Sequence, residues 1–424
     1  MPGKKIPYSG FSSVAIHGGH EADPNYAHLT PFYASSTFVF DEAEQGMRRF
    51  SGEEKGYIYS RWGNPTITEA EEKIAALESF GIADEDGNPL QLKAILHSSG
   101  MAAISTLMIG TLKAGDKILT HFSLYGGCQE LIEKILPPLG FEAIIIDLRD
   151  LNAAANAIKS DSKIKMLYLE TPANPTIQCV DLEELTIIAK ANNLIVAVDN
   201  TFATPYLQQP FQYGVDYVLH STTKFLNGHG TAIGGVLLGK DVEHMSGHIT
   251  KVHRLLGGNS NPFEAYLLTQ GMKTLEVRMQ RHCHNATEVA GFLEQHPAIS
   301  KVNYLGLPSH PDYYTASKQM RHAGAMLSFE MKDGLEAAKK FIDKLQMCIR
   351  AVSLGTCDTL LSHPASMTHY SVPKEKREEY GITDGLIRMS VGIENVQDIL
   401  MDLNSSLPTP RPTGSSGPAS RGVA

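Results

Sequence analysis

Between residues 94 and 221, short apolar runs alternate with segments of helical periodicity, and this alternation constrains the fold more than any other feature. The apolar runs predict strands at 94–97, 117–122, 143–147 and 165–170, and two more that end at Asp199 and Ser221. Helical patterns lie between them at 102–112, 128–136, 151–158 and 182–191. Strands that alternate with helices predict a mostly parallel sheet covered by helices on both faces. The sequence therefore indicates an α/β protein.

Polar and small residues gather where the predicted strands end. Ligands of open α/β sheets bind beyond the carboxyl ends of the strands, so residues at those ends are candidate site residues. They are Ser99, Gly100, Tyr125, Asn174, Asp199, Ser221 and Lys224. One such placement carries little information, but this many at one edge of a sheet predict a single pocket.

Lys224 lies among hydroxyl and glycine residues in the stretch 220–230, with an apolar run on either side. An ammonium between two buried strands loses hydration, which lowers its pKa toward the range useful for nucleophilic or Schiff-base chemistry. Ser221 and Thr223 flank it with hydroxyls suited to a phosphate, and Asp199 ends the preceding strand. A lysine, an acid and hydroxyls in this arrangement indicate pyridoxal phosphate (PLP). A buried salt bridge with helix-capping hydroxyls explains the same spacing equally well.

A second anion site is expected at the turn 98–101, Ser-Ser-Gly-Met, between a predicted strand and a predicted helix. Such a turn leaves free backbone N–H groups at the positive end of the helix. The turn by itself is weak evidence, but it lies where a phosphate would be held.

Composition narrows the class of protein. The chain has 424 residues, 42% of them hydrophobic and 20% charged, which is ordinary for a globular protein with two or more domains. The net charge of −9 argues against a general binder of nucleic acid or anionic membranes. No apolar run is long enough to span a bilayer, and the amino terminus lacks the apolar core of a secretory signal.

The five cysteines are scattered and form no Cys-x-x-Cys pair, as expected of reduced thiols in the cytoplasm. The cluster Arg281-His282-Cys283-His284 resembles a metal patch. Adjacent residues on a helix point in different directions, so we expect no metal there or elsewhere.

Changes in composition and periodicity along the chain predict four segments. Residues 1–60 are rich in glycine, serine, proline and aromatics and are interpreted as an extended N-terminal arm that packs on another subunit. Residues 61–264 form the large domain, and residues 265–405 form a smaller α+β domain. Residues 406–424 are proline, glycine and serine rich and are predicted to be disordered.

Local signals predict further elements. A capping box at 66–69 begins a helix that continues to about residue 77. A single long helix is expected over 263–290, and another over 335–345. The C-terminal domain should contain strands at 301–304, 326–330 and 349–352.

Eight motifs occur in order along the chain, and together they are specific. They are 59–66 (YSRWGNPT), 98–101 (SSGM), 124–127 (LYGG), 170–175 (ETPANP), 199–202 (DNTF), 221–224 (STTK), 353–355 (SLG) and 388–392 (RMSVG). On these motifs the chain resembles the cysteine/methionine-metabolism PLP enzymes of the aspartate-aminotransferase fold (PLP fold type I), across roughly residues 10–405. The resemblance implies a PLP-binding large domain and decides between PLP and the salt bridge.

The resemblance also implies roles at the cofactor. Lys224 would be the Schiff-base lysine and proton carrier, and Asp199 would keep the pyridine nitrogen protonated. The phosphate would be held by Gly100, Met101, Ser221 and Thr223, with Tyr59 and Arg61 reaching it from a neighbouring subunit. Tyr125 would stack on the ring and protonate a leaving thiol, and Asn174 would contact the ring hydroxyl. Because sites would be shared, the resemblance implies an obligate dimer, paired into a homotetramer.

The substrate side is implied by Arg388 and Ser353, with Arg388 holding the substrate carboxylate through bidentate geometry. Relatives that form or cleave cystathionine commonly carry a glutamate before the serine, whereas this chain has Val352. An apolar residue there suits a methylthio group better than a distal ammonium. The stretch 363–369 (HPASMTH) also resembles methionine γ-lyase.

One departure from the methionine γ-lyase pattern concerns the residues after Tyr125. Those enzymes typically carry a cysteine two positions after the stacking tyrosine, whereas this chain has Gly127 there and Cys128 one place later. The leading interpretation is the conversion of methionine to methanethiol, 2-oxobutanoate and ammonia. An O-acetylhomoserine sulfhydrylase is the second candidate and cystathionine γ-lyase the third. A PLP-fold protein kept for assembly or regulation, without catalysis, is the alternative from another class.

Overall fold

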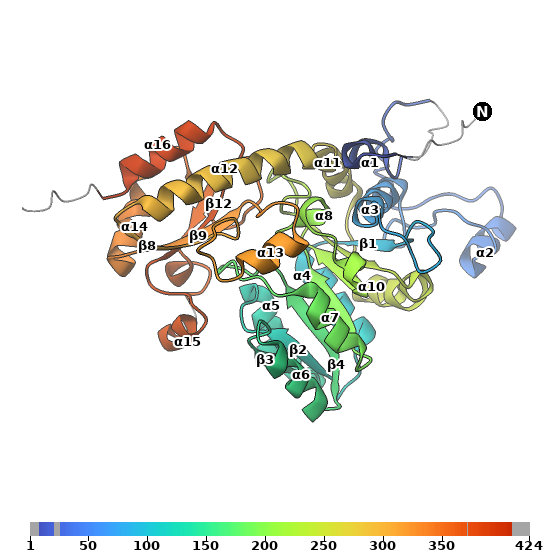
Figure 1. Ribbon diagram of the computed structural model, residues 1–424. Helices are drawn as coiled ribbons and strands as arrows, with labels where there is room; N and C mark the ends of the chain where they lie inside the picture. Colours follow the sequence, from blue (N-terminus) through green and yellow to red (C-terminus); the bar gives the residue numbers. More distant parts are fainter. Residues whose placement is uncertain (1–7, 21–25, 371, 409–424) are drawn as a thin grey trace, which may run out of the picture.

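Two β-sheets organise the computed structural model, which describes residues 8–20, 26–370 and 372–408 (Figure 1). Within these residues, the larger sheet has seven strands in the order β1-β7-β6-β5-β4-β2-β3. Their bounds are β1 Lys93–His97, β2 Lys117–His121, β3 Glu142–Ile146, β4 Ile164–Glu170, β5 Ile195–Asp199, β6 Tyr217–His220 and β7 Gly235–Gly239. All neighbours are parallel except β7, which is antiparallel to both β6 and β1. The predicted α/β class with a mostly parallel sheet is confirmed.

Helices cover both faces of this sheet, as the alternation predicted. One face packs on α3 (Pro65–Glu78), α6 (Leu151–Ser160) and α7 (Leu182–Lys190). The other packs on α4 (Gly100–Thr111) and on α5 (Gly126–Glu130), which continues as the π-helix η1 (Leu131–Ile135). Shorter elements complete this half of the chain. They are α8 Thr204–Leu207, α9 Val242–His244, α10 Thr250–Leu256, the 3-10 helices η2 Pro137–Leu139 and η3 Pro210–Tyr213, and the π-helix η4 Met245–Ile249.

The second sheet lies in the C-terminal part of the chain. Its order is β10-β11-β12-β9-β8, with bounds β8 Ile299–Asn303, β9 Met326–Met331, β10 Ile349–Arg350, β11 Leu360–Ser362 and β12 Leu386–Ser390. The helices α12 (Leu275–Gln295), α14 (Gly334–Lys344) and α16 (Val396–Ser406) pack on it around a separate apolar core (Figure 1). The remaining elements are α11 Pro262–Met272, α13 Tyr313–Gln319, α15 Lys374–Glu379 and η5 Pro364–Ser366.

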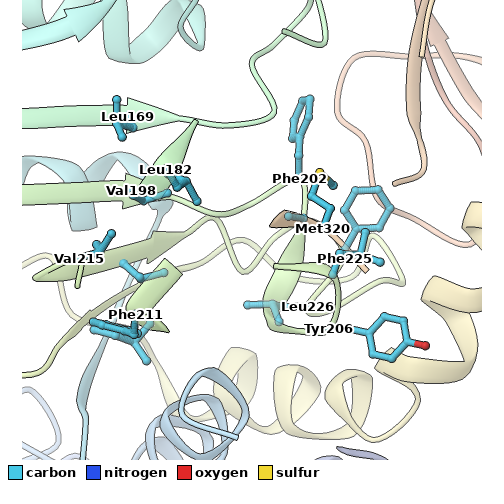
Figure 2. Close-up of a cluster of buried hydrophobic side chains, with 14 of the residues drawn as sticks. Leu169, Leu182, Val198, Phe202, Tyr206, Phe211, Val215, Phe225, Leu226 and Met320 are labelled. Atoms are coloured by element: carbon cyan, nitrogen blue, oxygen red, sulfur yellow. The ribbon is translucent and has the colours of Figure 1, made fainter. Parts of the chain in front are cut away.

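The core of the large sheet extends into the C-terminal part of the chain. Figure 2 shows Val198 of β5 in the same cluster as Phe225 and Leu226, which directly follow Lys224, and as Met320 from beyond α13. All four side chains are buried. Burial of Phe225 and Leu226 in this core therefore anchors the segment that carries Lys224 and holds the lysine at the edge of the sheet where the strands end.

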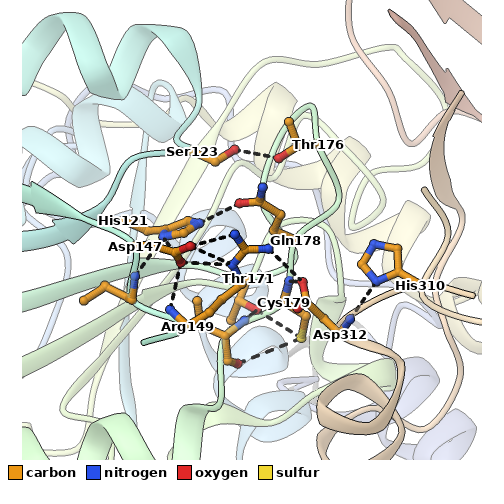
Figure 3. Close-up of polar contacts among 12 residues, drawn as sticks. His121, Ser123, Asp147, Arg149, Thr171, Thr176, Gln178, Cys179, His310 and Asp312 are labelled. Atoms are coloured by element: carbon orange, nitrogen blue, oxygen red, sulfur yellow. Dashed lines mark hydrogen bonds and ion pairs between the residues drawn. The ribbon is translucent and has the colours of Figure 1, made fainter. Parts of the chain in front are cut away.

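A polar cluster makes a second connection between the two halves (Figure 3). Arg149 forms ion pairs with Asp147 and, at 3.9 Å, with Asp312. Asp312 also accepts a hydrogen bond from the backbone N–H of Cys179 at 3.0 Å, and His121 is bonded to Gln178 at 2.7 Å. These contacts fasten the loop 171–180, which carries Asn174, to strands on one side and to the C-terminal half on the other.

The N-terminal arm differs from its prediction as extended chain. It contains α1 (Phe11–His17) and α2 (Ala43–Ser51), and a single bridge pairs Thr37 with Tyr59. The buried Lys73 donates hydrogen bonds to the backbone oxygens of Ala15 and Ile16 at the end of α1. A helix this short depends on such tertiary contacts, so its local sequence carries little signal.

The predicted capping box was wrong about the residue that begins α3. Asn64 is the N-cap, because its side chain accepts from the backbone N–H of Thr66 at 2.9 Å and Pro65 occupies the first turn. The helix predicted over 128–136 begins at Gly126, and its second part has π-helical bonding.

Three C-terminal predictions need correction. The single helix over 263–290 is two helices, α11 and α12, separated at Lys273–Thr274. The second sheet has five strands in the described residues rather than three, because β11 and β12 were not predicted as strands. The strand predicted at 349–352 ends at Arg350, so Val352 lies in the following loop.

The prediction of a disordered tail from residue 406 is wrong at its start, because α16 continues to Ser406 and Leu407 is buried. Residues 409–424 lie outside the described residues, as do 1–7, 21–25 and 371, so disorder there stays a prediction. In the part of the chain that the structure describes, no helix has the length and apolarity to cross a membrane. Those same residues contain no group of three or more His, Cys, Asp or Glu arranged to hold a metal ion.

Candidate active site

A cavity of about 1140 Å³ opens at the carboxyl ends of the central strands and is closed on one side by the C-terminal half of the chain. Twelve of the fourteen candidate site residues line it: Ser99, Gly100, Met101, Tyr125, Asn174, Asp199, Ser221, Thr223, Lys224, Val352, Ser353 and Arg388. They come from strands, loops and helix starts spread over nearly 290 positions of the sequence. The predicted single pocket therefore exists, and its volume suits a small-molecule site.

Tyr59 and Arg61 do not line this cavity. Arg61 lies beside a second, smaller cavity, where its Nη1 donates to the backbone oxygen of Arg254 at 2.7 Å. Its guanidinium also lies over the rings of Tyr59 and Trp62. Within one chain these two residues are separate from the other twelve, so their predicted role requires a second subunit.

Lys224 projects into the cavity and contacts the C-terminal half. Its Nζ donates to Ser353 Oγ at 2.9 Å. Burial, together with the nearby Arg388 guanidinium, lowers the pKa of Lys224 to about 8. At pH 7 this pKa leaves roughly a tenth of these side chains as the neutral, nucleophilic amine, far more than the ordinary lysine pKa of 10.5 would leave.

Packing on two sides fixes the backbone around Lys224. Arg278 of α12 donates to the carbonyl of Phe225 at 2.7 Å. On the other side, Gly355 has φ +78°, and a Cβ there would lie 2.6 Å from the backbone nitrogen of Phe225. Only glycine allows this approach, and the approach brings Ser353, two residues away, to the lysine.

Asp199 ends β5 and is held by one neighbour. Its Oδ1 accepts from both the backbone N–H of Thr201 at 3.0 Å and the Thr201 hydroxyl at 2.5 Å. The same hydroxyl accepts from the backbone N–H of Ser221 at 2.8 Å. Burial raises the pKa of Asp199, and the two bonds from Thr201 oppose that rise. A protonated ring nitrogen at this carboxylate would favour its ionised form further.

An anion cradle lies at the start of α4. Ser99 caps the helix by accepting from the N–H of Ala102 at 3.1 Å. The N–H groups of Gly100 and Met101 therefore lie at the positive end of the helix dipole, and this end borders the cavity. A Cβ on Gly100 would lie 3.0 Å from that of Ser221. Glycine thus keeps the helix start and Ser221 close enough to share one anion.

Thr223 is the fourth residue of this chain's cavity predicted to hold the phosphate, and its hydroxyl is already hydrogen-bonded to the backbone. Its hydroxyl donates to the carbonyl of Gly234 at 3.2 Å and accepts from the same residue's N–H at 3.0 Å. Its predicted phosphate contact would therefore compete with the bond to Gly234.

Arg388, on β12, faces the cavity from the opposite side. It donates to Asn174 Oδ1 at 3.0 Å and to the backbone oxygen of Ser353 at 2.7 Å. Its Nε is buried and has no hydrogen-bond partner among the described residues. A buried guanidinium with an unused donor fits a carboxylate ligand, since no carboxylate of the chain pairs with it in the described structure. Ser353 has φ +85°, a strained value for a residue with a side chain.

Comparison with known proteins agrees with this arrangement. The family of Cys/Met metabolism PLP-dependent enzymes matches residues 12–408. This chain belongs to that family.

Two curated relatives of this family member are L-methionine gamma-lyases. The one from Fusobacterium nucleatum subsp. nucleatum is 48% identical over 94% of this chain and 98% of its own length. The one from Porphyromonas gingivalis is 46% identical over 96% and 99%. A solved structure, cystathionine gamma-lyase from Lactobacillus plantarum complexed with L-serine, superposes with a TM-score of 0.85 at 38% identity and covers 94% of this chain and 98% of that one. The predicted PLP fold type I is confirmed.

The residues present fit PLP, the cofactor of this family. The cavity contains an amine of lowered pKa, a buried carboxylate, an anion cradle and a tyrosine ring, which is 48% exposed toward the opening. Lys224 would bind the aldehyde carbon, Asp199 the ring nitrogen, and Gly100, Met101 and Ser221 the phosphate.

The structure explains the departure at Gly127. This glycine lines the cavity, and a Cβ there would lie 2.7 Å from a ring carbon of Tyr125. A side chain at 127 would therefore have to displace the tyrosine ring as it is placed here. Cys128, in contrast, belongs to α5 and its side chain is fully buried in the apolar core, where burial raises the pKa of its thiol. Cys128 thus does not substitute for a cavity cysteine.

Several cavity residues were not among the predicted site residues. They are Glu170, Thr201, Phe202, Thr368, His369, Glu133 and Lys376. The last two form an ion pair of 2.9 Å between η1 and α15 at the cavity wall. Thr201 and Glu170 stand inside the quoted motifs 199–202 and 170–175, so the motifs contained the signal, but only the folded structure shows what their side chains contact.

Proposed function

We propose that this family member is a carbon–sulfur lyase that converts L-methionine, with water, to methanethiol, 2-oxobutanoate and ammonia by α,γ-elimination. The observation that carries the proposal is the link from Lys224 through Ser353 to Arg388, with the apolar Val352 next to that serine in the cavity wall. The link sets an amine, a carboxylate-binding guanidinium and the uncharged side chain of Val352 around one amino-acid substrate. The two methionine γ-lyase relatives at 46–48% identity support the same substrate.

Each of three cavity residues has its own role in the proposed reaction. Arg388 binds the substrate carboxylate through its free donor and so fixes the α carbon near Lys224. Lys224 Nζ removes the α proton and returns it where the elimination requires one. Tyr125, whose ring lines the cavity, donates a proton to the departing sulfur. PLP, when bound, supplies the electron sink that stabilises negative charge on the substrate.

A product assay over several substrates tests the proposal. The purified enzyme with PLP is given methionine, homocysteine, cystathionine, cysteine or O-acetylhomoserine, with and without sulfide. Methanethiol and 2-oxobutanoate from methionine alone are the expected result. Turnover of O-acetylhomoserine that depends on sulfide, with none of methionine, would instead indicate the sulfhydrylase, and preference for cystathionine would indicate the γ-lyase named third.

Substrate choice is predicted to depend on Val352. Val352→Glu should lower kcat/KM for methionine by more than about tenfold, because a carboxylate in the wall needs a cation that methionine lacks. Cystathionine carries a distal ammonium, so its kcat/KM should be spared or increased. The comparison is a difference of two transition-state free energies, and both substrates are measured on both proteins.

Val352→Gln is the matched control, since it has the size of glutamate without the charge. In the single chain Val352 is 57% exposed, so either side chain fits without disturbing the core. Equal losses for methionine in both variants would assign the effect to size. If Val352→Glu kept its methionine activity and gained nothing with cystathionine, Val352 would not determine specificity.

The active enzyme is proposed to be a dimer with shared sites, paired into a homotetramer. Tyr59 and Arg61 lie apart from the cavity of their own chain but in an arm with exposed apolar side chains, including Val39, Met47 and Phe50. An arm that exposes such residues suits burial against a second subunit. The described cysteines are free thiols, which supports a cytoplasmic location.

Subunit mixing tests the shared site. Arg61→Ala and Lys224→Ala should each be inactive alone, because each removes one group from every site. Hybrid dimers should recover up to about half of the sites' activity, since one of the two sites regains both groups. Mass spectrometry of the mixture confirms that hybrids form, and hybrids without activity would argue against sharing.

A further inference from the structure

Glu170 is a buried carboxylate at the floor of the cavity whose position resembles that of Asp199. It ends β4 directly beside Asp199, with which it is paired in the strand register. It lines the cavity and is only 6% exposed. Because the two residues have the same register on adjacent strands, their side chains leave the same face of the sheet.

The Glu170 carboxylate holds the backbone of two separate segments. Its Oε2 accepts from the N–H of Tyr125 at 2.7 Å, where the chain turns into α5. The backbone N–H of Asn174, in the loop after β4, also faces this carboxylate. One side chain thus ties together the two residues that are predicted to contact the face and the hydroxyl of the cofactor ring.

The surroundings of Glu170 argue against a role in stability alone. Burial, with the Asp199 charge beside it, raises the pKa of Glu170 well above its usual range. None of the salt bridges found in the described residues pairs Glu170 with a cation. A buried charge beside a like charge is costly, and a neutral side chain of similar shape avoids that cost. The carboxylate is explained better by what it positions than by stability.

We propose that Glu170 is a positioning residue: through the N–H groups of Tyr125 and Asn174 it sets the tyrosine ring and the asparagine amide against PLP. Removing one acceptor oxygen frees one of the two segments. The proposal rests on PLP binding and on the predicted roles of Tyr125 and Asn174, not on the choice of methionine, so it holds whichever sulfur amino acid is the substrate.

Binding of PLP to Glu170→Gln tests the proposal without turnover. Glutamine keeps one acceptor oxygen but turns an amide donor toward the other backbone N–H, which leaves that bond unmade. The dissociation constant of PLP, titrated into the cofactor-free protein, should rise about tenfold. The visible circular dichroism per bound cofactor, which reports the asymmetry around the ring, should fall by about half or more as the tyrosine loses its fixed orientation.

Two further variants make the test decisive. Glu170→Asp keeps the charge but loses reach, so it should show the same losses, and it serves if the glutamine variant does not fold. Glu130→Gln is the matched control, because Glu130 lines the same cavity but, among the described residues, forms its ion pair only with the exposed Lys134. It should leave both readouts unchanged.

Three outcomes would overturn the proposal. The first is wild-type PLP affinity and circular dichroism in both Glu170 variants. The second is a loss confined to the glutamine variant, which would assign the effect to charge rather than position. The third is a lowered melting temperature of the cofactor-free protein with an unchanged signal per bound cofactor, which would make Glu170 a stability residue. A failure of methionine turnover in the wild type would leave this test intact.

Discussion

Lys224→Ala is expected to lower kcat for methionine by about 10³-fold or more and to remove the visible absorbance of covalently bound cofactor. The reason is that alanine removes both the amine that binds PLP and the group that carries the α proton, and acid–base catalysis alone contributes on the order of 10²–10⁴. The lowered pKa of Lys224, about 8, makes it suited to both tasks. Absorbance spectra and steady-state kinetics measure the two losses.

Lys73 supplies a matched control for this prediction. Among the described residues it is a second lysine whose pKa is lowered to about 8, again chiefly by burial, but it bonds to the backbone at the end of α1 and lies outside the cavity. Lys73→Met should lower thermal stability while the absorbance of bound cofactor stays normal. Normal turnover in Lys224→Ala would remove the central assignment of this site.

Arg388→Gln is expected to lower kcat/KM for methionine by about 100-fold or more, with most of the effect in KM. Truncating one partner of a buried, charged, bidentate contact costs about 2–5 kcal/mol. Here the substrate carboxylate would lose its cation in the buried part of the cavity that Arg388 lines. The absorbance of bound cofactor should persist, because Lys224 is intact. Arg388→Lys should recover only part of the loss, since lysine lacks the planar fork.

Arg350→Gln is the matched control for Arg388. It lies two residues before Val352, but its guanidinium is in an exposed ion pair with Asp343. It should change kcat/KM by less than about twofold, as expected of a surface pair. An equal kcat/KM for Arg388→Gln and wild type, at normal cofactor content, would show that another residue binds the carboxylate.

The local pattern of the sequence was sufficient for the large sheet. Strands such as β4 and β5 are buried on both faces and read as continuous apolar runs, and their helices carry a 3.6-residue period. Both signals lie within one element, so they survive without knowledge of neighbours. The position of Asp199 and Ser221 at strand ends followed from the same pattern.

Elements that depend on distant contacts were predicted less well. The arm helices α1 and α2 are too short to be stable alone, and β11, with three residues, is defined by its pairing with β12. The break between α11 and α12 lies where Gly271 packs against the backbone of Asn227. No hydrophobic periodicity within α11 or α12 predicts that contact.

By itself, the sequence determined the α/β architecture, the strand ends at which polar residues gather, and, through motifs in order, the PLP family. Only the tertiary structure decided which of these groups touch. The bond from Lys224 to Ser353 joins residues 129 positions apart, and that from Arg388 to Asn174 joins residues 214 apart. It also decided that Tyr59 and Arg61 lie apart from the cavity and that Glu170 accepts from the backbone N–H of Tyr125. The physical reason is that burial leaves a periodic signal within each element, whereas a hydrogen bond between elements depends on how their ends pack together.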